Sequence, residues 1–262
     1  MASEDAVVVD GLWEAYRARG RLGWRCDDER WALRDVDLSV PVGRCLGVIG
    51  GNGSGKTTLL QVVAGVIRPT RGTVSVRGRV LSLVDLSAGF HRDLIGHENV
   101  LIGGVLLGLT RREVRARYDE IVSFSGLPGE ALDRRLASYS AGMGLRLGFS
   151  LVVHARPDVL LVDEVLAVGD DAFQRQCLAR LDRLRTDGCA VIIVSHDMAL
   201  VRERCDEVAL LDAGSLVALD RPDVAIARHL DRCEGPALVP AERRLYEVPG
   251  RTRASRRLRG AS

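Results

Sequence analysis

Lysine is almost absent from the 262-residue chain: of its 37 basic side chains, only Lys56 is not an arginine. Long apolar runs are also missing. The longest candidate, Val100 to Leu109, has about half of the ~18–20 residues that a membrane helix needs, and glycines interrupt it. Acidic residues stand near the N-terminus, where a secretory signal would carry basic ones. We therefore expect the chain to lie in the cytosol, or on the cytoplasmic side of the cell membrane through a partner.

Aromatic residues are few, at 4% of the chain, whereas apolar residues make up 47% and charged residues 27%. This balance is ordinary for a globular protein and excludes disorder throughout, collagen and a small disulfide scaffold. The six cysteines show no CxxC spacing, so a metal site or a redox pair is not expected. We expect reduced thiols, most of them buried.

Short runs rich in Val, Ile and Leu alternate with longer stretches of helical periodicity. The runs at 45–49, 159–162 and 190–194 are apolar almost throughout, as expected of strands buried on both faces of a parallel sheet. The other predicted strands are 6–9, 36–40, 73–76, 80–84, 208–211 and 216–218. The predicted helices are 56–66, 97–107, 111–125, 141–155, 171–187, 197–204 and 222–232.

The order of these elements indicates an α/β domain over residues 1–234 with a helical subdomain inserted at about 97–156. The tail, residues 235–262, lacks periodicity and holds seven arginines against two glutamates, a net charge of +5 in a chain of net +2. A basic tail can bind nucleic acid or anionic lipid. A solvated, disordered end is the commoner meaning, so we expect no stable binding of nucleic acid.

A glycine-rich loop follows the predicted strand 45–49. Its sequence matches G-x-x-x-x-G-K-[ST] with a strand before it and a helix after it, the context that a phosphate-binding loop requires. The glycines at 51, 53 and 55 allow a positive φ and a close approach of the backbone to a ligand. Successive N–H groups and the helix N-terminus can then face the phosphates. The expected nucleotide-binding residues of the loop are Gly50, Gly51, Asn52, Gly53, Ser54, Gly55, Lys56, Thr57 and Thr58.

The only lysine of the chain occupies the position of this loop that demands an ammonium group. Lys56 can reach the β- and γ-phosphates of a nucleotide, whereas the planar guanidinium of arginine does not fit a loop shaped around an ammonium. Thr57 offers its hydroxyl to Mg²⁺. The loop therefore predicts ATP and Mg²⁺ as cofactors, with Lys56 acting in both binding and catalysis.

Two predicted strands end in residues suited to hydrolysis. Strand 159–162 leads into Asp163 and Glu164; in phosphate-loop enzymes the strand-end aspartate holds Mg²⁺, and a glutamate can orient or deprotonate the attacking water. Strand 190–194 leads to His196, which can hydrogen-bond the γ-phosphate. Such residues are often only solvated caps or structural groups. Beside a phosphate loop, we expect Asp163 to be a metal ligand and Glu164 and His196 to be catalytic.

Together these motifs resemble the ATPase subunit of ABC transporters. The additional element is Tyr139-Ser140-Ala141-Gly142-Met143, a variant of the LSGGQ signature of that family. The resemblance implies a P-loop NTPase fold: an α/β ABC ATPase domain with a mixed-sheet core, an inserted helical subdomain and an N-terminal antiparallel β part. It also implies a homodimer that encloses two ATP, in which Ser140, Gly142 and Met143 contact the nucleotide held by the second copy.

One branch of the family, which exports polysaccharides of the O-antigen, capsule and teichoic-acid type, is similar in further segments. These are residues 89–91, 96–99, 145–147 and the run 163–170. The resemblance implies that Tyr16 stacks on adenine and that the D-loop, Gly169-Asp170, contacts the opposite subunit. It also implies that the helices at 97–156 dock on a separate multi-span membrane permease.

The sequence departs from this branch in two places. The glutamine usual in the Q-loop falls on Leu86, and the nearest polar residue is Asp85. Either Asp85 contacts Mg²⁺ in its place, or Asp85 is a solvated loop acid and water fills the position. In addition, the tail is too short for the C-terminal sugar-binding domain of some members. We therefore expect the permease, rather than this chain, to handle the lipid-linked glycan.

The resemblance implies an ATP-binding and ATP-hydrolysing subunit of an ABC exporter that moves a lipid-linked polysaccharide or polyol-phosphate polymer. An exporter ATPase for another lipid or a secondary metabolite is one alternative. A soluble ABC ATPase acting on the ribosome or on nucleic acid is another; the basic tail favours it. Against it, ribosome-acting members usually carry two ATPase domains in one chain, and DNA-repair members carry a long coiled coil.

Overall fold

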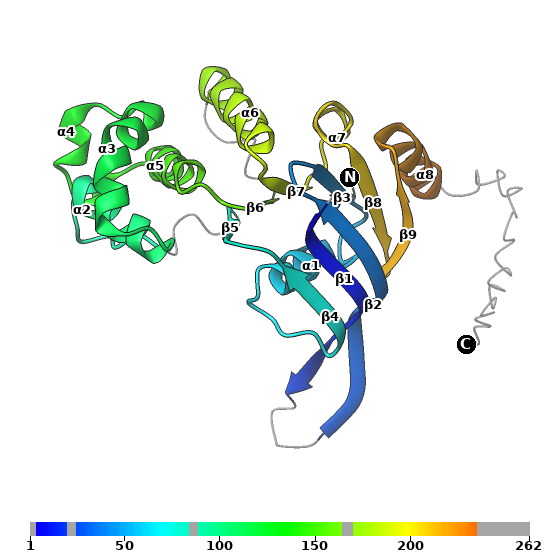
Figure 1. Cartoon of the computed structure of the whole chain (residues 1–262). Coiled ribbons are helices and arrows are strands. Elements are labelled where there is room, and N and C mark those ends of the chain that lie inside the picture. Colours follow the sequence, from blue (N-terminus) through cyan, green and yellow to red (C-terminus); the bar gives the residue numbers. More distant parts are fainter. Residues whose placement is uncertain (1–3, 20–24, 84–88, 164–169, 235–262) are drawn as a thin grey trace, which may run out of the picture.

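A computed structural model describes residues 4–19, 25–83, 89–163 and 170–234 (Figure 1). The strands are β1 (Asp5–Arg19), β2 (Arg25–Pro41), β3 (Cys45–Ile49), β4 (Arg71–Val76), β5 (Val80–Ser82), β6 (Val159–Asp163), β7 (Ala190–Val194), β8 (Glu207–Asp212) and β9 (Ser215–Asp220). The helices are α1 (Lys56–Val63), α2 (Gly96–Leu106), α3 (Arg111–Ser125), α4 (Gly129–Leu132), α5 (Ala141–His154), α6 (Asp171–Thr186), α7 (Met198–Arg204) and α8 (Pro222–Glu234), with a short 3-10 turn, η1 (Leu136–Ser138).

The central sheet has six strands in the order β5-β6-β7-β3-β8-β9. The first five run parallel, and β9 pairs antiparallel with β8. Every residue of β3 and β7 is buried, which explains why both strands are apolar throughout. The mixed α/β sheet expected from the sequence is confirmed, and the predicted bounds of these two strands match the structure.

A second sheet, in the order β2-β1-β4, is antiparallel and confirms the expected N-terminal β part. Its first two strands are much longer than the predicted 6–9 and 36–40. Register shifts interrupt their pairing, for example between Val9 and Leu12. Each shift moves the following side chains to the other face of the sheet, so the alternation that marks a strand in sequence is lost beyond the first few residues.

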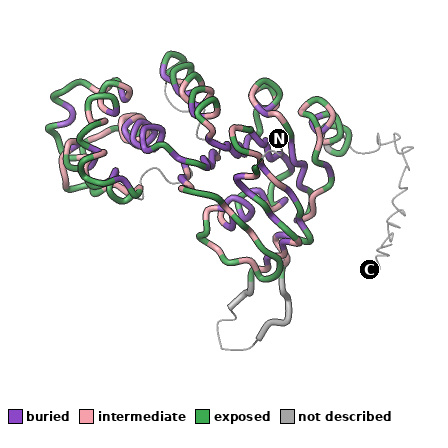
Figure 2. Tube along the Cα trace, in the orientation of Figure 1, coloured by how far each residue is buried: buried purple, intermediate pink, exposed green. Residues whose placement is uncertain are grey.

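The central sheet is the middle layer between two apolar cores (Figure 2). Alternate side chains of β3 belong to different cores. Leu46 and Val48 pack with the antiparallel sheet and α1, whereas Cys45 and Ile49 pack with the helices on the opposite face of the central sheet. Four free cysteine thiols lie buried in this interior, as expected: Cys45, Cys177, Cys189 and Cys205.

Helices α2 to α5 form a block at the β5–β6 end of the central sheet (Figure 1). Glycines allow α2 to pack closely within it, because a Cβ at Gly103 would lie 2.6 Å from the side chain of Leu151, and one at Gly104 would lie 2.5 Å from that of Val114. The block follows the predicted insertion; its limits and the domain limit at 234 remain predictions. No helix in the described ranges combines the length and apolarity required to cross a bilayer.

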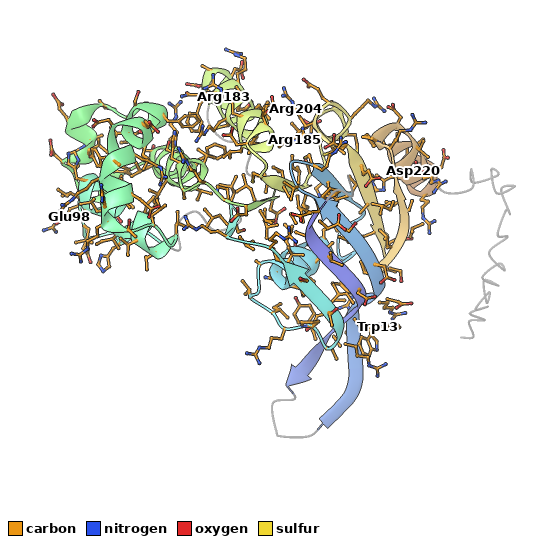
Figure 3. The ribbon with its side chains drawn as sticks, viewed as in Figure 1. Trp13, Glu98, Arg183, Arg185, Arg204 and Asp220 are labelled. Carbon is orange, nitrogen blue, oxygen red and sulfur yellow. The ribbon has the colours of Figure 1, made fainter. Side chains whose placement is uncertain are left out.

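Arginine hydrogen bonds join two further helices, α6 and α7. Arg185, near the end of α6, donates to the backbone carbonyl of Arg204 on α7 at 2.9 Å, and Arg204 donates to Asp182 at 2.6 Å (Figure 3). These two helices cover the sheet next to β7, so the contacts fix the segment that follows β7 and carries His196.

Candidate functional site

The glycine-rich loop joins the end of β3 to α1, whose first residue is Lys56. Gly53 and Gly55 take positive φ angles of 75° and 106°, as predicted. The prediction is wrong for Gly51, which does not have a positive φ; Gly50 has one instead, at 149°. The turn out of β3 therefore begins one residue earlier than the sequence suggested.

Two of these glycines lie where no side chain fits. A Cβ at Gly50 would lie 2.1 Å from the carbonyl oxygen of Leu211, and a Cβ at Gly55 would lie 2.6 Å from that of Ala32. Leu211 belongs to β8 and Ala32 to β2. The loop is thus held between the two sheets, and its shape is fixed by backbone from distant parts of the chain.

Lys56 is buried within this loop, with 7% of its surface exposed. Its ammonium donates hydrogen bonds of 2.9 Å to the carbonyl oxygens of Gly50 and Gly51. The buried hydroxyl of Ser54 has no hydrogen-bond partner among the described residues. Because α1 also begins without a side-chain cap, the loop gathers an ammonium group, a helix N-terminus and a buried hydroxyl at one place. Such a set suits an anion with several oxygens.

A pocket of about 450 Å³ opens beside the loop, a size suited to a small organic ligand. Tyr16 is 47% exposed beside it. The Tyr16 hydroxyl lies 3.2 Å from that of Thr58 and donates to Gln61 at 3.3 Å, so the aromatic ring is fixed relative to α1. Trp31 also lines the pocket and contacts Trp13 edge to face (Figure 3). The lining residues are Tyr16, Arg30, Trp31, Ala32, Gly53, Ser54, Gly55, Lys56, Thr57 and Thr58.

The predicted hydrolytic residues lie at the ends of two adjacent strands, β6 and β7, and β7 in turn pairs with β3. Asp163 is the last residue of β6 and pairs in register with Val194, the last residue of β7. His196 follows β7 and is exposed. Because β3, β6 and β7 are parallel, Asp163 and His196 lie at the same edge of the sheet as the loop. The other two predicted residues at this edge, Glu164 and Asp85, lie outside the described residues.

One titratable group near this edge was not predicted from the sequence: His229 on α8. Burial lowers the pKa of His229, and the positive charges of Lys56 and His196 lower it further. The ion pair between Arg232 and Asp212, at 2.8 Å, holds the same part of α8 against the end of β8. No motif marks His229 in the sequence, because only the packing of α8 brings it near the loop.

The signature residues Ser140, Gly142 and Met143 lie at the N-terminus of α5. Ser140 is the N-cap of the helix, and its hydroxyl accepts the N–H of Met143 at 3.2 Å. Ser140 is exposed, and a Cβ at Gly142 would find no neighbour closer than 4.0 Å. Within the described part of the chain, none of the three lines the pocket beside the phosphate loop.

A second, apolar groove of about 360 Å³ lies in the helical block, between α2 and the start of α3. Three of its aliphatic side chains are among the most exposed large apolar groups of the chain: Ile102 at 43%, Val105 at 42% and Leu106 at 65%. Glu98 marks this helix in Figure 3. Leu94 and Leu101 complete the apolar floor, and the charged residues of the rim are Glu98, Arg111 and Arg115.

Known proteins are similar to this chain in fold or in sequence. A solved structure of an ATP-binding subunit of an ABC transporter superposes with a TM-score of 0.73 at 22% identity, over 86% of this chain and 93% of that one. The O-antigen export system ATP-binding protein RfbB of Myxococcus xanthus is 37% identical over 95% of this chain. The teichoic acids export ATP-binding protein TagH of Lactococcus lactis is 38% identical over 81% of it.

The chain spans 60% of the length of the Myxococcus protein and 46% of the Lactococcus protein. The family model for ABC transporters matches residues 33–167, which include the phosphate loop, the helical block, the signature segment and Asp163. This match covers more than half of the chain and agrees with the fold. The chain belongs to the ABC transporter family.

Proposed function

We propose that this chain is the ATP-binding and ATP-hydrolysing subunit of an exporter that moves a lipid-linked polysaccharide or polyol-phosphate polymer across the cytoplasmic membrane. The observation that carries the ATPase role is the buried Lys56 in a left-handed glycine loop, next to a pocket with an aromatic ring. The substrate class comes from the relatives, whose names assign them to O-antigen and teichoic acid export.

In this proposal the nucleotide lies along the pocket. The triphosphate occupies the loop, where Lys56 and the N-terminus of α1 neutralise its charge. The adenine stacks on Tyr16, whose exposed ring lies in the same pocket. His229 lies close enough to Lys56 and His196 for their charges to lower its pKa, so it adds a neutral imidazole near the phosphates.

The residues at the strand edge fit a magnesium ion. Thr57 and Asp163 supply oxygen donors, which this hard cation prefers. Thr57 directly follows the lysine that binds the phosphates, and Asp163 ends β6 at the same edge of the sheet. When bound, Mg²⁺ neutralises charge that develops on the phosphate oxygens. Asp85 stays a predicted third contact. The proposed roles of Glu164 and His196 are to activate the attacking water and to hydrogen-bond the γ-phosphate.

The exposed N-terminus of α5 supports a composite site. Ser140, Gly142 and Met143 do not line the pocket of their own chain, Ser140 is exposed, and a Cβ at Gly142 would meet nothing closer than 4.0 Å. This chain can therefore present them to the nucleotide held by a second copy. Two chains related by a two-fold axis would then form two equivalent sites, each with a loop from one chain and a signature segment from the other.

The apolar groove between α2 and α3 is the proposed docking surface for the permease. Ile102, Val105 and Leu106 are costly to leave in water, and the groove lies in the helical block that the family resemblance assigns to this contact. Binding there would hold the chain on the cytoplasmic face of the membrane through its partner. Ile102→Asp should reduce copurification of the permease and leave ATP binding unchanged.

Complementation between two inactive variants tests the composite ATPase. Lys56→Ala removes the cation of the loop, whereas Ser140→Arg blocks the signature surface and leaves the loop intact. Each variant alone should lack ATPase activity, while a mixture should regain some, because one complete site forms in each mixed dimer. Arg68→Ala, at an exposed site beyond α1, is the control. Full ATP affinity in Lys56→Ala would overturn the loop assignment, and a mixture without activity would overturn the composite site.

The substrate needs a separate experiment. Copurification of the chain with its permease, followed by mass spectrometry of bound lipid-linked material, should recover a glycan or polyol-phosphate polymer. Recovery of a different lipid or a small metabolite would replace the polysaccharide assignment and leave the ATPase role in place.

A further inference from the structure

Arg146 and Asp170 form an ion pair that joins α5 to the start of α6. The guanidinium of Arg146 donates to the Oδ2 atom of Asp170 at 2.8 Å. Arg146 lies on the second turn of α5, the helix that begins with the signature segment, and Asp170 is the N-cap of α6. The pair therefore links two segments that are far apart in the sequence.

Both oxygens of the Asp170 carboxylate are in use. Oδ1 accepts the backbone N–H of Phe173 at 2.9 Å, and Oδ2 accepts from Arg146. The hydrogen bond from Phe173 and the charge of Arg146 both lower the pKa of Asp170. The carboxylate is thus ionised, and its orientation is fixed by two partners on different elements.

Arg146 is itself held by an aromatic surface. Its guanidinium lies over the ring of Phe173, 4.8 Å from the centroid. Phe173 is 4% exposed and packs edge to face against Phe124 and Phe149, at centroid separations of 5.9 and 6.0 Å. Arginine suits this place because its planar group can stack on a ring while its N–H groups bind a carboxylate, which a lysine cannot do equally well.

We propose that Arg146 is a positioning residue for ATP hydrolysis, which fixes Asp170 relative to the signature segment so that both shift as one body when two chains close around ATP. This inference rests on the proposed function, because only a composite site requires the two segments to be aligned. Neither residue lines the described pocket beside the phosphate loop. Loss of the pair should therefore affect turnover and leave ATP binding by a single chain unchanged.

Three variants of the full chain separate the parts of this contact. Arg146→Ala removes the charge and the stacking, and Arg146→Lys keeps the charge without the planar group. Asp170→Asn keeps an oxygen that can cap α6 but removes the charge that binds Arg146. Arg175→Ala, at an exposed site on the same α6, is the control for loss of one arginine.

We expect Arg146→Ala and Asp170→Asn to lower kcat for ATP about tenfold, a typical coupling for a contacting pair, with the Kd for ATP unchanged within about twofold. Arg146→Lys should recover only part of the loss. The double variant Arg146→Ala/Asp170→Asn should be no slower than either single variant, because the same contact is lost in each. Arg175→Ala should behave as the wild type.

The inference is overturned if kcat is unchanged, if the two losses multiply in the double variant, or if Kd rises as much as kcat falls. Thermal unfolding is measured for each variant; should Arg146→Ala fail to fold, Asp170→Asn decides, because its helix cap is retained. A wild-type chain that does not hydrolyse ATP would overturn the proposed function itself. An active wild type with unaffected variants would overturn only the positioning role.

Discussion

The hydroxyl oxygens of Tyr16 and Thr58 lie 3.2 Å apart, which joins β1 to the first turn of α1. The antiparallel sheet and the phosphate loop are thus connected by side chains as well as by backbone. Tyr16 is still 47% exposed and lines the pocket beside the loop.

Two replacements of Tyr16 distinguish the contribution of its ring to ATP binding from that of its hydroxyl. Stacking of a base on an aromatic side chain is worth about 1–3 kcal/mol, so Tyr16→Ala should weaken ATP binding by roughly 5- to 150-fold. Tyr16→Phe keeps the ring and should weaken it far less. Calorimetric titration of both variants measures this; equal losses would assign the effect to the hydroxyl contact instead of stacking.

The loop glycines offer a matched pair of substitutions. Gly55→Ala forces a side chain into a φ of 106° and to within 2.6 Å of the Ala32 carbonyl oxygen, whereas a Cβ at Gly51 meets nothing within 4 Å. Gly55→Ala should lower the free energy of unfolding by ~2 kcal/mol or more and abolish ATP binding. Gly51→Ala should unfold as the wild type does. Similar denaturation midpoints for both variants would contradict the described loop geometry.

Glu164→Gln keeps the size of the side chain and removes its basicity. If Glu164 activates the attacking water, hydrolysis should slow by ~10²–10⁴-fold while ATP still binds. The variant should then accumulate as an ATP-bound dimer, visible by size-exclusion chromatography with ATP. The nearby Asp171→Asn should hydrolyse ATP normally, and a wild-type rate in Glu164→Gln would remove Glu164 from the mechanism.

Leu86 stands where the Q-loop glutamine is expected, and Asp85 beside it is the nearest polar residue. A carboxylate is a good ligand for Mg²⁺, and a leucine side chain cannot bind it. Asp85→Ala should therefore raise the Mg²⁺ concentration needed for half-maximal ATPase activity, and Leu86→Ala should not. The same Mg²⁺ dependence in Asp85→Ala and wild type would mean that Asp85 is a solvated acid.

Stability should depend on pH through His154. Burial in α5 lowers its pKa below the ordinary 6.5, so the unfolded chain binds this proton more readily than the folded one. The free energy of unfolding should fall as pH drops below 6.5, until the folded group also titrates. His154→Gln keeps an N–H donor for the Ser150 carbonyl and does not titrate. Urea unfolding at about pH 8 and about pH 5 should show a smaller loss in the variant than in the wild type; equal losses would exclude His154.

Much of the sheet and the loop could be predicted because local patterns determine them. Strands β3 and β7 are buried on both faces and are apolar at every position, so their ends stand out in the sequence. The opposite holds for β1 and β2, where bulges change which residues point inward. Helix α4, from Gly129 to Leu132, and the turn η1 are too short to show helical periodicity.

Some residues of the candidate site could be predicted from local patterns and others could not. Lys56, Asp163 and His196 follow strands that could be located, so their shared edge could be predicted. His229 could not, because it reaches this edge only through the packing of α8 on β8. The link from Arg146 to Asp170 likewise depends on how α5 and α6 lie against each other, which no spacing in the sequence encodes.

The strand order also sets when the site can form during synthesis. Strand β3, which leads into the phosphate loop, leaves the ribosome early, but its neighbours β7 and β8 are made long after it. Gly50 rests against Leu211, so the backbone that shapes the loop is complete only after β8 has emerged. A nascent chain therefore carries every residue of the loop long before it has a loop of this shape, and nucleotide binding has to wait until β8 has been made.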